Sequence, residues 1–495
     1  MKINPMKTKL FFTFLATLFC VPAMATQVAW RGERVNFTFP QMKVGEKFKV
    51  EMDGGLPVQV NFAHKVKAEG GERYDVLMPE RVPGAETQFV VATVDVPADA
   101  RVGVYNLRVD GKIVDTLKVS RQRLPEPKDW QFYLDLWQHP EAVARWCKVP
   151  LWSDEHFEAM RPVMTRLANA GQKVITASII EEPWDHQTFD DWHSMIRWTR
   201  KDNGKWTFDY SAFDKWVAFM ESCGIDKQIN CYTMLPWSKN LGYYDEHGNA
   251  KNMKLEPGTP LFEEVWSVFL KDFVKHLRAT GKLKKTSIAL DERPDAMARA
   301  ARDILAKAAP ELKIASAVDR PSREQDFAHD ISPLFSYTED IAEFAEKRRA
   351  AGKITTFYVC CGPEKPNTFP HSPLEESRWL PIYASAKNLD GFLRWAYNSW
   401  TENPFVNTKH RARDWAAGDC FLVYPPNYTT LRFEALRDGI EDYEKIRILR
   451  KRLSPQKMQA IDGALKTHFT VPNGHSGNCK PGLTAVLAEI DKLSK

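Results

Sequence analysis

The pattern of apolar and polar residues changes once along the chain, near residue 125. From residue 28 to about residue 124, apolar and polar residues alternate, as they do in 35–39, 58–62 and 89–96. A period of two is typical of strands that bury one face. Six or seven such strands, separated by turn residues such as Asp53-Gly54-Gly55, predict a small all-β sandwich.

Beyond residue 129, strand-like and helix-like apolar patterns alternate. The strand patterns occupy residues 130–137, 173–180, 228–234, 286–292, 313–318, 333–337, 354–361 and 392–400. Helical patterns, most of them ended by Gly or Pro, occupy residues 155–170, 213–223, 260–280, 295–309, 339–351, 375–387 and 431–453. The crossover at 319–330 has room only for a short helix. This alternation predicts an α/β fold, a (β/α)8 TIM barrel, with a doubly wound open sheet as the alternative.

The first residues have the pattern of a signal peptide. Lys2, Lys7 and Lys9 precede an apolar run at 10–21, and Ala23-Met24-Ala25 places small residues at the −3 and −1 positions for cleavage. We therefore expect export across the inner membrane, to the periplasm or the exterior. The predicted organisation is a signal peptide (1–25), a β-sandwich domain (26–124), a catalytic barrel (129–453) and a C-terminal helical tail (454–495).

Composition and charge exclude several classes of protein. The chain has 495 residues, 43% of them hydrophobic, and a net charge of +5 that is too small for a dedicated nucleic-acid binder. No apolar run after the signal peptide is long enough to predict a membrane span. The sequence contains no C-x-x-C and no H-E-x-x-H, so we expect neither a metal site nor a cofactor. Cys360-Cys361 can form a strained disulfide or remain two thiols.

In a barrel of this kind, the active site lies at the carboxyl ends of the strands. The predicted strand ends combine carboxylates with aromatic rings, which suits sugars, because C–H faces stack on rings while hydroxyls bond to acids. Alternatively, the tryptophans only fill the upper layer of the barrel. The substrate-binding candidates chosen by this position are Trp137, Trp237, Tyr337, Trp395, Tyr397, Asn398 and Trp400.

The sharpest local signal is the pair Asp291-Glu292, which directly follows the buried-strand pattern 287–290. Adjacent carboxylates cannot readily straddle a glycosidic bond, as most glycosidases require. They do suit substrate-assisted catalysis, in which the 2-acetamido oxygen of the sugar attacks the anomeric carbon. One acid then protonates the leaving oxygen and the other holds the acetamide. A purely structural alternative is that Asp291 pairs with Arg293 and begins the next helix.

Three longer segments carry a family resemblance. The runs GFLRWAYNSW (391–400), AGDCFLVYP (417–425) and LRFEALRDGIEDYE (431–444) resemble glycoside hydrolase family 123, as do DLWQHP (135–140) and the pair Asp291-Glu292. The resemblance implies a retaining β-N-acetylgalactosaminidase that works through an oxazoline intermediate. It also implies that Glu292 is the general acid/base and that Asp291 orients the acetamide.

The sequence therefore predicts an exported exo-glycosidase that removes terminal β-linked N-acetylgalactosamine, with a glycan as its partner. Two alternatives stay open at this point. One is a conventional retaining glycosidase that uses Glu339 or another acid at the barrel mouth as nucleophile. The other is a glycan-binding protein without turnover. The choice between galacto and gluco substrates and the oligomeric state do not follow from the sequence.

Overall fold

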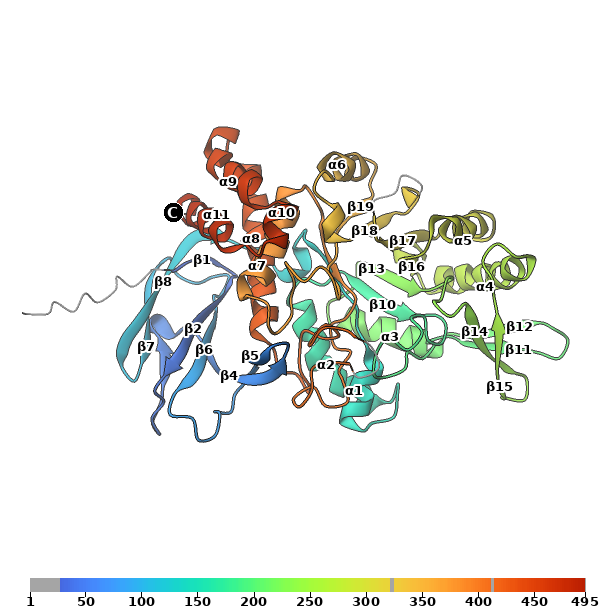
Figure 1. Cartoon of the computed structure of the whole chain (residues 1–495), viewed down its shortest axis with the longest axis horizontal. Helices are drawn as coiled ribbons and strands as arrows, with labels where there is room; N and C mark the ends of the chain where they lie inside the picture. Colours follow the sequence, from blue (N-terminus) through green and yellow to red (C-terminus); the bar gives the residue numbers. More distant parts are fainter. Residues whose placement is uncertain (1–26, 321–324, 411–413, 495) are drawn as a thin grey trace, which may run out of the picture.

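Two four-stranded sheets, packed face to face, form the N-terminal part of the chain (Figure 1). The structure, a computed structural model, describes residues 27–320, 325–410 and 414–494, so the predicted signal peptide lies outside it. One sheet has the order β1 (Gln27–Arg31), β8 (Lys112–Arg123), β7 (Gly103–Val109), β3 (Val50–Met52). The other has the order β2 (Arg34–Met42), β6 (Gln88–Asp95), β4 (Val58–Ala68), β5 (Gly71–Met78). The alternating apolar residues, such as Phe37, Val94 and Leu107, form the core between them.

Eight parallel strands form the second part of the chain. They are β9 (Tyr133–Leu136), β10 (Val174–Ser178), β13 (Gln228–Tyr232), β16 (Thr286–Asp291), β17 (Lys313–Val318), β18 (Asp330–Pro333), β19 (Ile354–Thr355) and β20 (Gly391–Arg394). Six of them pair in the order β10-β13-β16-β17-β18-β19, and β20 pairs with β9. Parallel bridges from Leu134 to Gln172 and from Tyr358 to Leu393 join the two groups. The pairings therefore close into a ring, as the predicted barrel requires.

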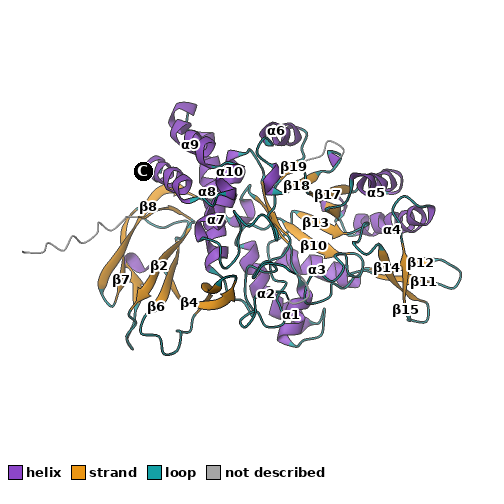
Figure 2. Cartoon of the chain, in the orientation of Figure 1, coloured by secondary structure: helices purple, strands orange, loops and turns teal. Residues whose placement is uncertain are grey.

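Helices surround these strands (Figure 2). They are α1 (Pro140–Cys147), α2 (Asp154–Ala168), α3 (Ser211–Ser222), α4 (Pro260–Ala279), α5 (Asp295–Ala308), α6 (Ala342–Ala350), α7 (Leu374–Ala386) and α8 (Leu431–Arg452). The tail contains α9 (Pro455–His468), α10 (Val471–His475) and α11 (Lys480–Leu493). Between β17 and β18, the described residues contain no α-helix. Within the described ranges, no helix combines the length and apolar character that crossing a membrane requires.

The predicted sixth strand, 333–337, was wrong by three residues. The strand is β18, and Phe335–Tyr337 form a single 3-10 turn instead. The shift has a physical cause, because β18 begins with a buried carboxyl group, Asp330, which interrupts the apolar pattern. Gln228 donates to Asp330 at 3.0 Å inside the barrel. The predicted seventh and eighth strands were also too long, since β19 ends at Thr355 and β20 at Arg394.

A further four-stranded sheet, absent from the sequence prediction, is inserted after β10 and β13. Its order is β12 (Trp206–Asp209), β11 (Arg197–Arg200), β14 (Asn240–Asp245), β15 (Ala250–Lys254). It extends from the barrel beside α4 (Figure 1). The ring of Trp198 stacks on Phe269 of α4 with the centroids 4.5 Å apart, which anchors the sheet to the barrel.

Helix α8 connects the sandwich to the barrel. Arg432 at its start binds Asp75 of β5, with Nε 3.1 Å from each carboxylate oxygen, and both side chains are buried. Arg34 binds Glu434 at 3.0 Å, and Lys445 binds Glu33. The segment 431–444, which carried much of the family resemblance, therefore holds the two parts together.

Candidate active site

A pocket of about 250 Å³ lies at the carboxyl ends of the barrel strands. Asp291 and Glu292 reach it from the end of β16, Ala317 from β17 and Leu393 from β20. Its other lining residues are Trp137, Trp184, Asp185, Gln187, Trp237, Tyr358, Cys360, Cys361, Trp395, Trp415 and Asp419. The pocket thus combines carboxyl groups with aromatic rings at the place where a barrel carries its active site.

The backbone turns sharply between the two adjacent carboxyl groups. Asp291 is the last residue of β16 and pairs with Ala317, and the amide of Glu292 donates to the Ala317 carbonyl at 3.0 Å. Glu292 has a φ of 48°, in the left-handed region that residues with side chains rarely adopt. Neighbouring residues of a regular strand would point to opposite faces. The turn removes that alternation, so both carboxyl groups line the same pocket.

Burial disfavours the charged form of both carboxyl groups. Burial and the neighbouring Glu292 together raise the pKa of Asp291 to about 7. The indole N–H of Trp237, which donates to Asp291 at 3.3 Å, opposes this shift. Burial also raises the pKa of Glu292, although Tyr358 donates its hydroxyl to Glu292 Oε1 and opposes the shift. Two like charges so close resist ionising together. The pKa of each carboxyl group therefore lies above that of a free side chain.

Aromatic rings form the walls and floor of the pocket. The Trp137 ring lies at a centroid distance of 4.9 Å from Trp184, and both side chains are buried. The Trp237 ring is 37% exposed, with the guanidinium of Arg293 4.2 Å from its centroid. Trp395 lies edge-on to Trp415 at 6.1 Å. Of the predicted binding residues, Trp137, Trp237 and Trp395 therefore line the pocket.

Three other predicted residues lie in the core, away from the pocket. Tyr397 donates its hydroxyl to the carbonyl of Val163 at 3.0 Å, and Trp400 donates its indole N–H to the carbonyl of Val423 at 2.7 Å. The Asn398 side chain hydrogen-bonds to the backbone amide and carbonyl of His139. The reason is that β20 ends at Arg394. The three residues therefore lie beyond the end of the strand and do not face the pocket.

Tyr337 and Glu339 also lie outside the pocket. The Tyr337 ring is 41% exposed and contacts the guanidinium of Arg320, 4.6 Å from the ring centroid. The Glu339 carboxylate accepts from the amide of Val471 at 2.6 Å and pairs with Lys387 at 2.9 Å. Glu339 thus ties the helical tail to the barrel, and the structure does not place it as a nucleophile.

The sequence prediction missed several lining residues. Trp184 follows the predicted strand 173–180 and could have been found by the same positional argument. Tyr358 lies inside the predicted strand 354–361 and was missed because β19 ends earlier, at Thr355. Trp415 lies in a long loop without periodicity, which gave no signal. Asp419 is fully buried and accepts from Arg394 at 2.6 Å, so its carboxylate is held by an ion pair at the pocket wall. The pocket thus depends on loops that meet only in the folded chain.

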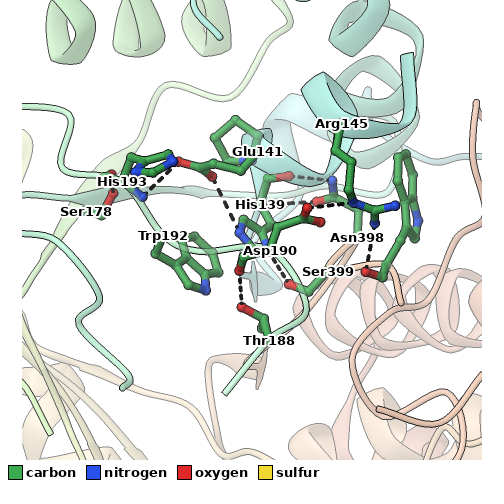
Figure 3. Close-up of polar contacts among 12 residues, drawn as sticks. His139, Glu141, Arg145, Ser178, Thr188, Asp190, Trp192, His193, Asn398 and Ser399 are labelled. Atoms are coloured by element: carbon green, nitrogen blue, oxygen red, sulfur yellow. Dashed lines mark hydrogen bonds and ion pairs between the residues drawn. The ribbon is translucent and has the colours of Figure 1, made fainter. Parts of the chain in front are cut away.

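A polar cluster surrounds His139 (Figure 3). His139 stacks on Trp192 with the centroids 3.8 Å apart, and its Nδ1 lies 3.0 Å from the hydroxyl of Ser399. Burial lowers the pKa of His139 to about 3 and raises that of the nearby Glu141 to about 8, so both side chains are uncharged near neutrality. Trp192 in turn contacts the pocket residue Trp184 at 4.7 Å.

Cysteines and metal-type donors also occur near the pocket. The sulfur atoms of Cys360 and Cys361 are 3.9 Å apart, so the two residues are present as thiols. Donor atoms close enough to share an ion occur in two groups of described residues, Glu182, His186 and Asp191 near the pocket, and Asp202, Glu246 and His247 on the inserted sheet. His186 is exposed and hydrogen-bonds to Asp191 at 2.9 Å. These groups therefore have partners within the chain.

Comparisons with known proteins agree with this geometry. The family model described as "Glycoside hydrolase 123, catalytic domain" matches residues 137–449. Among solved structures, a family 123 glycoside hydrolase from Clostridium perfringens, solved for the details of glycolipid glycan hydrolysis, is 24% identical. That similarity covers 95% of each chain with a TM-score of 0.82, and it shows the same fold.

More distant structures resemble only the general architecture. A GH10 xylanase with a bacterial Ig-like domain from termite gut is 10% identical, covering 86% of this chain and 100% of its own, with a TM-score of 0.37. An endo-β1,6-glucanase is 10% identical, covering 62% of this chain and 76% of its own, with a TM-score of 0.38. Neither supports an argument about this chain. No sequence among the curated proteins matches it.

Proposed function

Since the chain belongs to glycoside hydrolase family 123, we propose that it is an exo-acting β-N-acetylhexosaminidase that removes terminal β-linked N-acetylgalactosamine with retention of configuration. The observation that carries the proposal is the pair Asp291-Glu292, which lines one pocket and in which burial raises the pKa of both carboxyl groups. The glycan of a glycolipid is the substrate class we propose, because the similar C. perfringens enzyme was studied on it.

In the proposed first step, Glu292 acts as the general acid. It protonates the glycosidic oxygen while the carbonyl oxygen of the 2-acetamido group attacks the anomeric carbon and expels the aglycone. Asp291 accepts the acetamide N–H and stabilises the positive charge that develops on the forming oxazoline. Tyr358 holds the Glu292 carboxyl group, and Trp237 holds that of Asp291. These contacts keep the two groups in place before substrate binds.

In the second step, Glu292 acts as the general base. Its carboxylate removes a proton from a water molecule, which attacks the anomeric carbon and opens the oxazoline. Because the anomeric carbon is inverted twice, the product keeps the β configuration. The buried setting of Glu292 suits both roles, since a raised pKa keeps the acid form available near neutral pH.

Replacing Glu292 tests this assignment. Glu292→Gln should lower kcat for a natural glycan by between about 100- and 10,000-fold, the usual contribution of a general acid. For an aryl glycoside with a good leaving group, the same variant should lose less kcat, because that leaving group departs without being protonated. The matched control is Glu181→Gln, since Glu181 pairs with His193 at 3.3 Å and does not line the pocket. Near-normal hydrolysis of the natural glycan by Glu292→Gln would sink the assignment.

A thiazoline analogue separates the substrate-assisted mechanism from the conventional one. N-acetylgalactosamine-thiazoline mimics the oxazoline and should inhibit tightly only if the acetamide is the nucleophile. A conventional nucleophile would have to be another carboxylate of the pocket. Of these, Asp419 is fully buried in its ion pair with Arg394, and Asp185 is the remaining one. Weak inhibition of the wild type, together with loss of turnover in Asp185→Asn, would favour the conventional mechanism.

A further inference from the structure

A second cavity lies where the sandwich meets the barrel, and it shares no lining residue with the catalytic pocket. Its volume is about 500 Å³, within the range of pockets that bind small organic ligands. Four arginines line it, namely Arg34 from β2, Arg161 and Arg166 from α2, and Arg437 from α8. Figure 1 shows the sandwich beside α8 at this junction.

Three of these guanidinium groups gather around one buried carboxylate, Glu434. Burial raises the pKa of Glu434, but Arg34, then Arg437 and Arg166, outweigh this effect and hold the pKa below its usual value. The Glu434 carboxylate binds Arg34 at 3.0 Å. A single carboxylate cannot neutralise three guanidinium groups, which are charged at any physiological pH. The lining also contains the exposed Glu158, so four arginines face two carboxylates and the wall of the cavity keeps an excess of positive charge.

The other acidic partners do not remove this excess. Glu441 lies 3.3 Å from Arg437 but does not line the cavity, and burial raises the pKa of Glu441 to about 8. Asp95 binds Arg34 at 3.2 Å from the solvent side and does not line the cavity. Solvent screens exposed pairs of this kind.

Each of the three guanidinium groups also keeps a donor for a ligand. Arg166 donates to the side chain and carbonyl of Asn427 through Nε and Nη2, at 3.0 and 2.8 Å. Its Nη1 makes no hydrogen bond to any residue that the structure describes. The same holds for Nη2 of Arg34 and Nη1 of Arg437. A planar guanidinium fork is well suited to carboxylate and sulfate groups.

We propose that this cavity binds an acidic saccharide, a sugar that carries a carboxylate or sulfate group. The volume exceeds what a free ion needs, so the cavity has room for a larger molecule that carries the anionic group. The inference rests on the proposed function, because it expects the anion to be part of a glycan.

Calorimetric titration with N-acetylneuraminic acid tests the inference, with galactose and inorganic sulfate as comparisons. We expect the acidic sugar to bind, galactose not to bind, and sulfate to bind at least tenfold more weakly. Binding should weaken as salt rises from about 0.05 to 0.5 M, since salt screens the guanidinium charges. The inference fails if the acidic sugar does not bind, or if sulfate binds equally well.

Variants locate the site and separate it from catalysis. Arg166→Gln should weaken binding by about 10- to 100-fold, the value of a charged hydrogen bond. Arg161→Gln, at the exposed rim of the cavity, should also weaken binding of the acidic sugar. This variant leaves the contact between Arg166 and Asn427 in place. Arg302→Gln on α5 is the matched control, and aryl glycoside turnover should stay unchanged in all three variants.

The catalytic variant Glu292→Gln should bind the acidic sugar as tightly as the wild type does. Binding that is lost in Glu292→Gln, or unaffected by both cavity variants, would overturn the inference. If binding fails while the wild type still hydrolyses its substrate, the inference falls and the proposed function stands.

Discussion

Asp291 and Glu292 occupy positions that favour chemistry over stability. Two half-buried carboxyl groups lie side by side, and Glu292 adopts a left-handed backbone conformation. Residues held in such conformations cost free energy and are common at active sites. The indole of Trp237 and the hydroxyl of Tyr358 offset only part of this cost, because the pKa of each carboxyl group stays raised.

The raised pKa makes a prediction about stability. Folding raises the pKa of Asp291 from its ordinary value, near 4, to about 7. Between these values the folded state holds a proton that the unfolded state has released, so stability is lost as pH rises. Asp291→Asn should therefore raise the free energy of unfolding at pH 8, by on the order of 1 to 3 kcal/mol, and change it little at pH 4.

Urea denaturation at the two pH values measures this difference. Asp303→Asn, at an exposed position on α5, is the control and should have an equally small effect at both. A stabilisation by Asp291→Asn that is the same at pH 4 and pH 8 would contradict the burial of this carboxyl group.

At the scale of elements, helix α8 packs against α7 through a glycine. A Cβ atom at Gly439 would lie 2.3 Å from the carbonyl oxygen of Arg378, which is backbone and cannot move aside easily. Gly439 lies in the middle of α8, where glycine lowers helix stability. The close contact with α7 explains why this position is a glycine.

Two glycine substitutions separate packing from helix propensity. Gly439→Ala should lower the free energy of unfolding by about 2–3 kcal/mol, as overpacking does. Gly463→Ala in α9 should raise it by about 0.5–1 kcal/mol, since a Cβ at Gly463 would meet no atom within 4 Å. Thermal unfolding compares the two variants. Equal effects would show that α7 and α8 do not approach as closely as described.

The sequence predicted elements best where the pattern is local. The barrel helices and most strands begin and end within a few residues of their predicted bounds, because an amphipathic period and a Gly or Pro stop determine them. β18 was displaced because the buried Asp330 looks like a loop residue in the sequence. The inserted sheet was missed because its strands are short and carry few apolar residues.

The difference between local and tertiary signals also explains why only some residues of the site were predicted correctly. Asp291 and Glu292 follow a long apolar strand, so their position was visible in the sequence. Tyr397 and Trp400 were placed at the mouth because β20 seemed to extend to residue 400, whereas it ends at Arg394. Trp415 reaches the pocket from a loop, and only tertiary structure brings it there.

At the scale of the whole molecule, buried ion pairs join the sandwich to the barrel. Arg432 of α8 binds Asp75 of β5, and it also donates to the carbonyls of Thr368 and Gly418. Both charged side chains are at most 2% exposed. Removing one partner of such a pair leaves the other buried and unpaired, which is far more costly than losing an exposed pair.

The junction therefore predicts that sandwich and barrel depend on each other. Asp75→Asn should lower the free energy of unfolding by about 3–5 kcal/mol, because Arg432 loses its counter-charge. Asp53→Asn, which removes a half-exposed pair with Arg108, should have a much smaller effect, because solvent screens this pair. Denaturant titration distinguishes the two, and a similar small effect of both would mean that the ion pair does not hold the junction.

The most direct test of the proposed mechanism changes the substrate rather than the protein. Aryl β-N-acetylgalactosaminides whose acetyl group carries zero to three fluorine atoms have a progressively less nucleophilic carbonyl oxygen. If that oxygen attacks the anomeric carbon while Asp291 and Glu292 assist, kcat/KM of the wild type must fall steeply with each fluorine. A value of kcat/KM that is insensitive to fluorination would contradict the substrate-assisted account.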